Sequence, residues 1–242
     1  CLQALASGGA WKGELWSRRC DGSPYPQWLS MSAVRDPEGR TTHTVAIFTD
    51  ISERKAAEAR IRHLAQHDFL TGLPNRRLLE DRLQQAVAFA ARRGGRVGLL
   101  FLDLDRFKII NDTCGHPVGD ALLRELACRL TGALRESDTL GRSGGDEFIV
   151  LLPGLDDPAD AGRVGRKLLA AICEPVQVGE HELYVTGSVG IAVYPEDGHD
   201  AETLVRHADT AMFHAKHAGR NQCQYFTPAM NTANDARIWL EN

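Results

Sequence analysis

The sequence predicts an α+β fold in which helices flank a mainly antiparallel sheet. The apolar run at 97–102 has no polar alternation, so it predicts a central strand covered on both faces, with Asp103 at its end. Gly144 and Gly145 stand between two apolar runs and predict a tight hairpin, because glycine accepts positive φ without steric cost. Helical and strand patterns alternate along the rest of the chain, which favours one sheet packed against helices.

The first fifty residues predict a separate β-rich unit. Residues 11–19, 26–35 and 41–50 are rich in strand-forming residues and are separated by turn sequences, so they predict a three-stranded meander. Three strands alone make a thin core. An amphipathic helix is expected at 52–65, and its apolar stripe consists of Ile51, Ala57, Ile61, Leu64 and Ala65. Two interpretations stay open: a helix packed on its own domain, or a short parallel coiled coil that changes how two downstream domains face each other.

The remaining elements follow from hydrophobic periodicity and from glycine, proline and polar breaks. Helices are expected at 78–92, 105–111, 118–134, 159–172 and 201–217. Strands are expected at 97–103, on both sides of the Gly144–Gly145 turn, and at 222–226. A pair of adjacent strands is expected at 175–178 and 183–193.

Composition excludes several function classes. The 242 residues are 43% apolar and 25% charged, which is ordinary for a globular protein with a sizeable core. The formal charge of −4, with mixed signs, argues against a nucleic-acid partner. No apolar stretch reaches the length of a membrane helix, so we expect no membrane segment in this fragment and a cytoplasmic domain, with any membrane anchor elsewhere in the parent protein. The six cysteines show no Cys-x-x-Cys spacing, which disfavours a zinc or redox site.

Acidic residues at the end of the central strand and at the hairpin suggest a site for a divalent cation and a nucleotide. The hairpin carries Asp146 and Glu147, and Asp103 ends the strand at 97–102. Hard cations prefer oxygen ligands and bind phosphates with several waters retained. This pattern predicts a Mg²⁺ (or Mn²⁺) site that also holds a nucleoside triphosphate.

Six ordered motifs between residues 67 and 221 resemble the GGDEF family of diguanylate cyclases. The motifs are HDFLTGLPNR at 67–76, DLDRFKIIND at 103–112, GHPVGD at 115–120, RSGGDEF at 142–148, SVGIA at 188–192 and AKHAGRN at 215–221. The resemblance assigns residues 67–227 to a GGDEF domain with a sheet like the palm of nucleotide cyclases and polymerases. It implies condensation of two GTP molecules into cyclic di-GMP, with release of pyrophosphate, in a homodimer.

The resemblance also implies roles for the acidic residues. Asp103, Glu147 and the carbonyl of Leu104 match the family's metal ligands. Asp146 matches the position nearest the attacking 3′-hydroxyl. Whether a side chain acts as general base, or metal coordination alone lowers the pKa of the hydroxyl, stays open.

Cationic and amide groups match the triphosphate contacts of the family. Lys108, Lys216 and Arg220 occupy the cation positions. The backbone amides of Arg106 and Phe107, expected in the first turn of a helix, would also face phosphate. Lys108 is counted with Asp146 and Glu147 among the catalytic residues.

Two further pairs match recognition sites for guanine and for the product. Asn111 and Asp120 match the positions that read guanine, since a carboxylate accepts from the N1 and N2 donors that adenine lacks. Helix C-capping by Asn111 and an N-terminal helix charge at Asp120 are also physically sound roles, and both kinds of role can coexist. Arg135 and Asp138 form the RxxD pattern five residues before the hairpin, the family's inhibitory site for cyclic di-GMP.

The flanking segments resemble parts of other signalling modules. Residues 1–51 resemble the C-terminal part of a PAS/PAC sensor domain, and residues 52–66 a signalling linker helix. Residues 228–242 resemble the connector that leads to an EAL phosphodiesterase domain. An alternative function therefore stays open, in which this domain binds GTP and activates an attached EAL phosphodiesterase.

Overall fold

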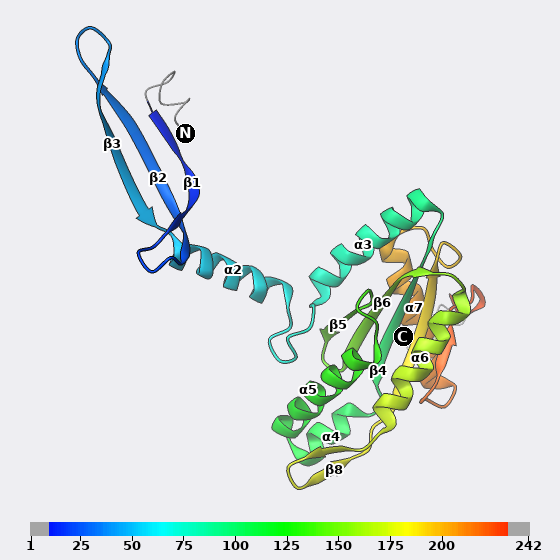
Figure 1. Cartoon of the computed structure of the whole chain (residues 1–242). Coiled ribbons are helices and arrows are strands. Elements are labelled where there is room, and N and C mark those ends of the chain that lie inside the picture. Colours follow the sequence, from blue (N-terminus) through cyan, green and yellow to red (C-terminus); the bar gives the residue numbers. More distant parts are fainter. Residues whose placement is uncertain (1–9, 232–242) are drawn as a thin grey trace, which may run out of the picture. The chain divides into compact units, whose positions relative to one another are not determined.

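The structure is a computed structural model that describes residues 10–231, with residue 62 described by its backbone alone. The chain divides into two compact units, Cys1–Ala65 and Gln66–Asn242. Figure 1 labels the elements of each unit. Among the helices of residues 10–231, none combines the length and the apolar composition that a membrane crossing requires.

The first unit contains the expected meander and helix. Strands β1 (Ala10–Arg18), β2 (Pro24–Arg35) and β3 (Thr41–Asp50) pair antiparallel in that order. Helix α2 (Ser52–Gln66) follows directly, and its Arg54 and Lys55 both form ion pairs with Glu14 of β1, at 2.7 and 2.6 Å. The expected stripe is covered only at its start: Ile51 is buried, whereas Ala57, Ile61, Leu64 and Ala65 are exposed.

The second unit is built on a five-stranded, mainly antiparallel sheet with the order β10-β9-β4-β6-β5. The central strand β4 pairs antiparallel with both β6 and β9, and only the edge strand β10 runs parallel to its neighbour. The bounds are β4 Arg96–Leu104, β5 Thr139–Gly144, β6 Glu147–Leu155, β9 Gly187–Tyr194 and β10 Cys223–Tyr225. The expected α+β class and palm-like sheet are confirmed.

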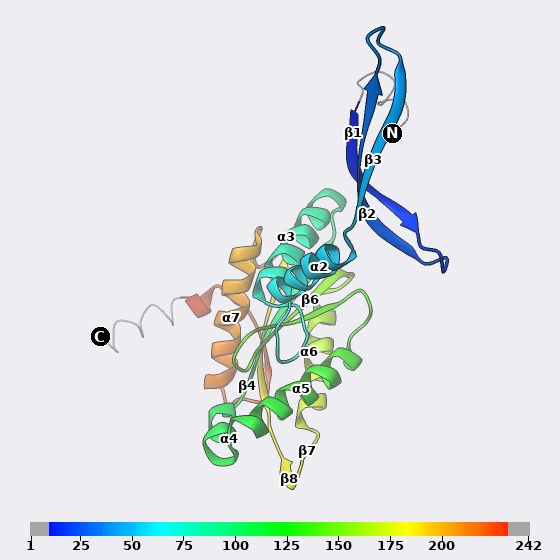
Figure 2. The same ribbon diagram turned by 90° about the vertical axis from the view of Figure 1, so that its left-hand side faces the viewer.

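Helices cover both faces of this sheet, as Figure 1 and Figure 2 show. Side chains alternate along β4, so Leu100 and Leu102 enter one core while Leu99 and Phe101 enter the other. The first core is closed by α5 (His116–Ala133) and α6 (Pro158–Cys173), and the second by α3 (Arg76–Arg93) and α7 (Ala201–His217). A central strand without polar alternation is therefore the strand that is buried on both sides.

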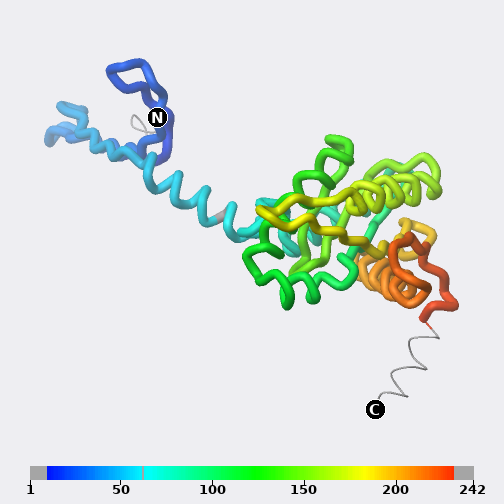
Figure 3. The backbone as a smooth tube through the Cα atoms, turned by 90° about the horizontal axis from the view of Figure 1, so that it is seen from below, coloured from blue at the N-terminus to red at the C-terminus, as the bar shows by residue number. Residues whose placement is uncertain are grey.

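Two expected elements are wrong in detail. The strand expected at 183–193 is interrupted: β8 (His181–Leu183) pairs with β7 (Val176–Val178) in a separate hairpin, while β9 pairs with β4. Figure 3 shows the backbone path through this region. The helix expected at 105–111 begins only at Phe107, as α4 (Phe107–Cys114). The cause is a left-handed Arg106 (φ 60°), which a helix cannot include.

Candidate active site

The register of β4 and β6 places Asp103 directly opposite Glu147. Both side chains project to the sheet face of α3 and α7, because their odd-numbered neighbours Leu99, Phe101 and Ile149 enter that core. The hairpin turn is shifted by one residue from the expected Gly-Gly pair, since Gly144 pairs with Glu147. The two central residues of the turn are thus Gly145 and Asp146. The Asp146 carbonyl accepts a hydrogen bond from the Leu104 amide at 3.3 Å.

A lysine of α7 completes this cluster. The Lys216 Nζ lies 2.7 Å from Asp103 Oδ2, so this expected triphosphate contact is paired with a carboxylate that is expected to bind the metal. Burial raises the pKa of Asp103 to about 6; Lys216 opposes the rise, and the charges of Asp146 and Glu147 add to it. The pKa of Glu147 is raised by burial and by the charges of Asp209 and Asp146. Negative charge is therefore crowded at this edge of the sheet.

The donor set fits a hard divalent cation. Asp103, Glu147 and the Leu104 carbonyl offer oxygen alone, which suits Mg²⁺ or Mn²⁺. Within residues 10–231, no three His, Cys, Asp or Glu side chains already form a complete metal cage. Mg²⁺ usually takes one or two carboxylates and fills its other positions with waters and substrate phosphates. Two carboxylates beside the expected triphosphate-binding groups are sufficient for such a cation.

Replacing Asp103 with asparagine is expected to stabilise the metal-free domain at pH 7. A folded-state pKa of about 6, above the ordinary 3.8, gives stability that is fully present below pH 3.8 and is lost as the pH rises through 6. The wild type should therefore lose roughly 1–2 kcal/mol relative to Asp103→Asn between pH 4 and pH 7. Thermal unfolding in a chelator, at both pH values, measures this difference. An equal pH response in both proteins would contradict it.

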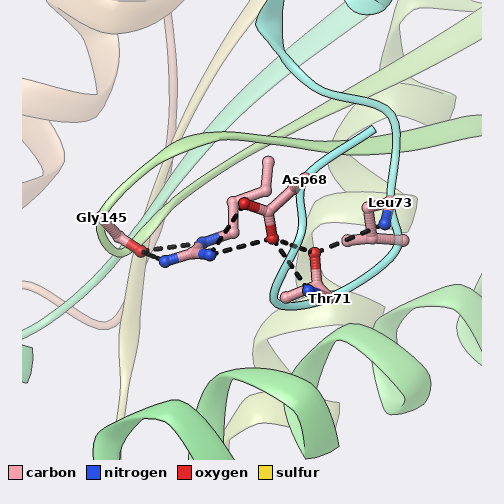
Figure 4. A network of polar contacts seen from close by, with 5 residues as sticks. Asp68, Thr71, Leu73 and Gly145 are labelled. Atoms are coloured by element: carbon pink, nitrogen blue, oxygen red, sulfur yellow. Dashed lines mark hydrogen bonds and ion pairs between the residues drawn. The ribbon is translucent and has the colours of Figure 1, made fainter. Parts of the chain in front are cut away.

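A buried arginine fixes the hairpin that carries the acidic residues. The Arg142 guanidinium donates to both oxygens of Asp68, at 2.9 and 3.1 Å, and to the Gly145 carbonyl at 2.9 and 2.6 Å. Figure 4 shows Asp68 and Gly145 on opposite sides of the guanidinium group. Asp68 also accepts from the amide and hydroxyl of Thr71. The HDFLTGLPNR motif thereby holds the hairpin turn, a role that sequence reasoning missed.

The two expected guanine-reading residues lie where α4 meets α5. Asn111 lies inside α4, and the C-cap is Gly115, so the alternative capping role of Asn111 is wrong. A Cβ added to Gly119 would lie 1.9 Å from Asn111 Oδ1, which shows that the two residues are in close contact. Asp120 follows Gly119 on α5 and is half-buried. The structure thus brings the amide and the carboxylate to one helix junction.

Replacing Gly119 with alanine is expected to displace the Asn111 side chain. Loss of the expected contact between the Asn111 amide and guanine should weaken GTP binding by about ten-fold or more. Gly132→Ala is the matched control, because it lies on the same helix and a Cβ there would meet nothing within 4 Å. The control should keep its GTP affinity and gain up to about 1 kcal/mol of stability. Equal GTP affinity in both variants, measured by calorimetry, would contradict the assignment.

Apart from Lys216 of α7, the expected phosphate-binding groups lie in the β4–α4 loop, in the first turn of α4 and in the α7–β10 loop. Arg106 precedes α4 as its N-cap residue, Phe107 is the first helical residue, and Lys108 is exposed in the first turn. Arg220 lies in the α7–β10 loop, with its Nε 4.0 Å from an oxygen of Asp105. Arg106, Asp105 and Arg220 line a cavity of about 490 Å³. The structure thus brings Arg106 and Arg220 together.

The RxxD residues form a turn at the other end of β5. Asp138 Oδ2 accepts from the Arg135 amide, and the Asp138 amide donates to the Arg135 carbonyl, both at 3.0 Å. The Arg135 side chain is exposed. Because β5 separates this turn from the hairpin, the two sites lie roughly 20 Å apart along the strand.

A larger cavity, of about 640 Å³, lies between α3, α7 and the sheet. Its lining includes Glu147 and Asp209, and burial raises the pKa of Asp209. Sequence reasoning missed Asp209. Its spacing of seven residues from Lys216, two turns along one helix face, was the available signal.

Known proteins resemble this chain over the same region. Residues 65–222 match the family model described as diguanylate cyclase, GGDEF domain. The bifunctional diguanylate cyclase/cyclic di-GMP phosphodiesterase MucR of Pseudomonas aeruginosa is 47% identical over 177 residues, 73% of this chain and 26% of MucR. The cyclic di-GMP phosphodiesterase PdeR of Escherichia coli is 38% identical over 235 residues, 97% of this chain and 35% of PdeR.

A third relative has a solved structure. The diguanylate cyclase TpbB of Pseudomonas aeruginosa is 41% identical over 184 residues, 76% of this chain and 41% of TpbB. The structure of its GGDEF domain superposes with a TM-score of 0.68 at 39% identity, covering 70% of this chain and 99% of that domain. The chain thus aligns with about a quarter to two-fifths of each curated relative. The matched region contains the Asp103–Glu147 pair, the hydrogen bonds of Arg142 to Asp68 and Gly145, and the α4–α5 junction. The chain belongs to the GGDEF family of diguanylate cyclase domains.

Proposed function

We propose that residues 67–227 form a diguanylate cyclase that condenses two GTP molecules into cyclic di-GMP and releases pyrophosphate. The observation that carries this proposal is the pairing of Asp103 with Glu147 across β4 and β6, with Lys216 at 2.7 Å from Asp103. Each domain offers one guanine-reading pair, Asn111 and Asp120. Because the product contains two guanylates, two copies must face each other, and the active form is a homodimer.

Each proposed residue has a defined task in the reaction. The 3′-hydroxyl of each GTP attacks the α-phosphorus of the other; in each of the two attacks the hydroxyl proton is released to water, a P–O bond forms and the bond to pyrophosphate breaks, so that two pyrophosphates leave. Asp103, Glu147 and the Leu104 carbonyl would hold Mg²⁺ or Mn²⁺, which supplies positive charge to the phosphoryl oxygens. Asp146 would lie nearest the attacking hydroxyl, where it would either bind the metal or assist removal of the proton.

The triphosphate and the base are bound by separate groups. Lys108, Lys216 and Arg220, with the Arg106 and Phe107 amides, bind the triphosphate and stabilise the pyrophosphate that leaves. A cation held by Asp103 would compete with Lys216 for that carboxylate, and the Lys216 ammonium would then be available to phosphate. Asn111 and Asp120 select guanine over adenine.

We also propose how the domain is regulated. Cyclic di-GMP binds at Arg135 and Asp138, away from the catalytic hairpin, and inhibits its own synthesis. The exposed guanidinium of Arg135 is suited to a phosphate or to a guanine edge.

The flanking segments fit a sensor-regulated protein. Residues 1–51 are proposed as the C-terminal part of a PAS/PAC domain, and residues 52–66 as its signalling linker helix. Residues 228–242 are proposed as a connector to an EAL domain; residues 232–242 lie outside the described part of the chain. The domain is proposed to act in the cytoplasm, without a nucleic-acid partner.

Incubation of the purified chain with GTP and Mg²⁺ tests the proposed activity. Chromatography should show cyclic di-GMP, with two pyrophosphates released per product, and ATP should give no product. Mn²⁺ should support the same reaction, and a chelator should stop it. Saturable GTP binding without product, at every protein concentration, would reject the cyclase.

That same outcome would favour a second function. The similarity to the phosphodiesterase PdeR covers 97% of this chain. A GGDEF domain in such a protein is proposed to bind GTP and activate an attached EAL phosphodiesterase. Hydrolysis of cyclic di-GMP by the full-length parent, faster with GTP than without it, would support this function.

A further inference from the structure

Asp105 is a buried carboxylate that the proposed reaction does not use. Its side chain is 2% exposed. It accepts hydrogen bonds from the Thr186 hydroxyl at 2.7 Å, from the Ser188 hydroxyl at 2.8 Å and from the Asn221 amide at 3.2 Å. The Asp105 amide donates to the Thr186 carbonyl at 2.8 Å. One side chain thus joins the β4–α4 loop, the start of β9 and the α7–β10 loop.

The loops around Asp105 have an unfavourable backbone conformation. Within residues 10–231, the non-glycine residues with positive φ are Arg106 (φ 60°), Arg220 (φ 63°) and Asn221 (φ 47°). A residue with a Cβ is disfavoured in this left-handed region. Such conformations persist only where surrounding contacts hold them. Arg106 is adjacent to Asp105 in sequence, Arg220 lies beside its carboxylate, and Asn221 donates to it.

These loops carry groups assigned above to the triphosphate. The turn at Arg106 directs the first amides of α4, and the loop after α7 presents Arg220, whose Nε is 4.0 Å from Asp105 Oδ1. We infer that Asp105 is a positioning residue: it holds the β4–α4 and α7–β10 loops so that their amides and Arg220 converge on the triphosphate. The inference rests on the proposed function, since it takes GTP as the ligand.

The predicted consequence concerns the phosphates and not the base. Asn111 and Asp120 lie at the α4–α5 junction and take no part in the contacts of Asp105. Loss of Asp105 should therefore weaken the binding of a triphosphate more than that of a monophosphate. A partly unfolded protein would instead lower both affinities by the same factor.

The test compares two ligands in the full chain with Mg²⁺ present. The probes are 3′-deoxy-GTP, which lacks the attacking hydroxyl, and GMP. Asp105→Ala should reduce the ratio of the two affinities by about ten-fold or more. Asp105→Asn should restore part of the ratio. The new amide oxygen can still accept from the Asn221 backbone amide, and the new NH₂ group can donate to the Ser188 hydroxyl, which then acts as the acceptor.

Asp197→Ala is the matched control. Asp197 is a half-buried carboxylate that accepts from the Val193 amide at 2.8 Å, beyond the opposite end of β9. Its loss should lower the melting temperature and leave the affinity ratio within two-fold. Thr186→Val removes one hydrogen bond from Asp105 and should reduce the affinity ratio about three-fold. This variant tests the inference even if Asp105→Ala does not fold.

The outcomes separate this inference from the proposed function. An unchanged ratio of the two affinities in folded Asp105→Ala would overturn the positioning role without affecting the proposed cyclase activity. If Asp105→Ala does not fold, an unchanged ratio in Thr186→Val leads to the same conclusion. A wild type that prefers neither ligand would overturn the GTP site itself, and the positioning role with it. A reduced ratio in Asp105→Ala, partly restored in Asp105→Asn and normal in Asp197→Ala, is the predicted result.

Discussion

Glu147→Gln is expected to reduce cyclic di-GMP synthesis by about a thousandfold or more, while the protein stays folded. The substitution removes one of the two carboxylates that face each other across β4 and β6. Its folded state should gain stability, because burial and the charges of Asp209 and Asp146 already raise the pKa of Glu147. GTP affinity should fall less than activity, since Asn111 and Asp120 are unchanged. Product chromatography, calorimetry and thermal unfolding measure the three quantities.

Glu80→Gln is the matched control for this prediction. Glu80 lines the same cavity as Glu147 but is exposed and pairs with Arg76, a residue of its own helix, at 2.9 Å. The identical change there should keep synthesis within about two-fold, because an exposed ion pair contributes little. Comparable losses of synthesis in both variants would mean that activity depends on the total charge of the cavity. They would contradict a specific role of the Glu147 carboxylate as a metal ligand.

Arg142→Ala is expected to destabilise the second unit by about 3–5 kcal/mol. The Arg142 and Asp68 side chains are only 9% and 14% exposed, so removal of the guanidinium leaves a buried carboxylate without its partner. The Gly145 carbonyl loses two hydrogen bonds in the same step. The turn that carries Asp146 should loosen, and synthesis should fall with stability. Denaturant unfolding and product formation measure the two effects.

Two variants sharpen this measurement. The double variant Asp68→Ala/Arg142→Ala should lose less stability than the sum of the single variants, because neither partner is left alone. Arg76→Ala removes the arginine of an exposed pair, whose side chains are 69% and 52% exposed, and should change stability by less than about 1 kcal/mol. Additive losses at Asp68 and Arg142 would show that the two side chains do not act together.

Local patterns predicted most of the domain that carries the site. The apolar run at 97–102 became the central strand β4 because a strand buried on both faces needs no polar alternation. The Gly144–Gly145 signal located the hairpin within one residue, since positive φ is needed there and glycine supplies it at low cost. These two elements carry Asp103 and Glu147, and the pairing of β4 with β6 in the fold places the two residues opposite each other.

Long-range contacts explain what local patterns missed. The break between β8 and β9 follows from pairing with β4, which ends at Leu104 opposite Gly187. The Asp68–Arg142 pair joins residues 74 positions apart, and Asp105 meets Asn221 across 116 positions. Hydrophobic periodicity describes residues that are close in sequence, so it cannot predict contacts between residues that are far apart in sequence. The left-handed conformation of Arg106 could not be predicted from local sequence either, because the residue is not a glycine and contacts with distant residues hold it.

We propose that two copies of this domain, each with one GTP, form one catalytic site. The most direct test is the initial rate of cyclic di-GMP synthesis per subunit at increasing protein concentration and saturating GTP. We predict that this rate rises with protein concentration and levels off when nearly all subunits are dimeric. It should follow the dimer fraction measured by analytical ultracentrifugation. A constant rate per subunit, down to concentrations at which the protein is monomeric, would contradict the claim.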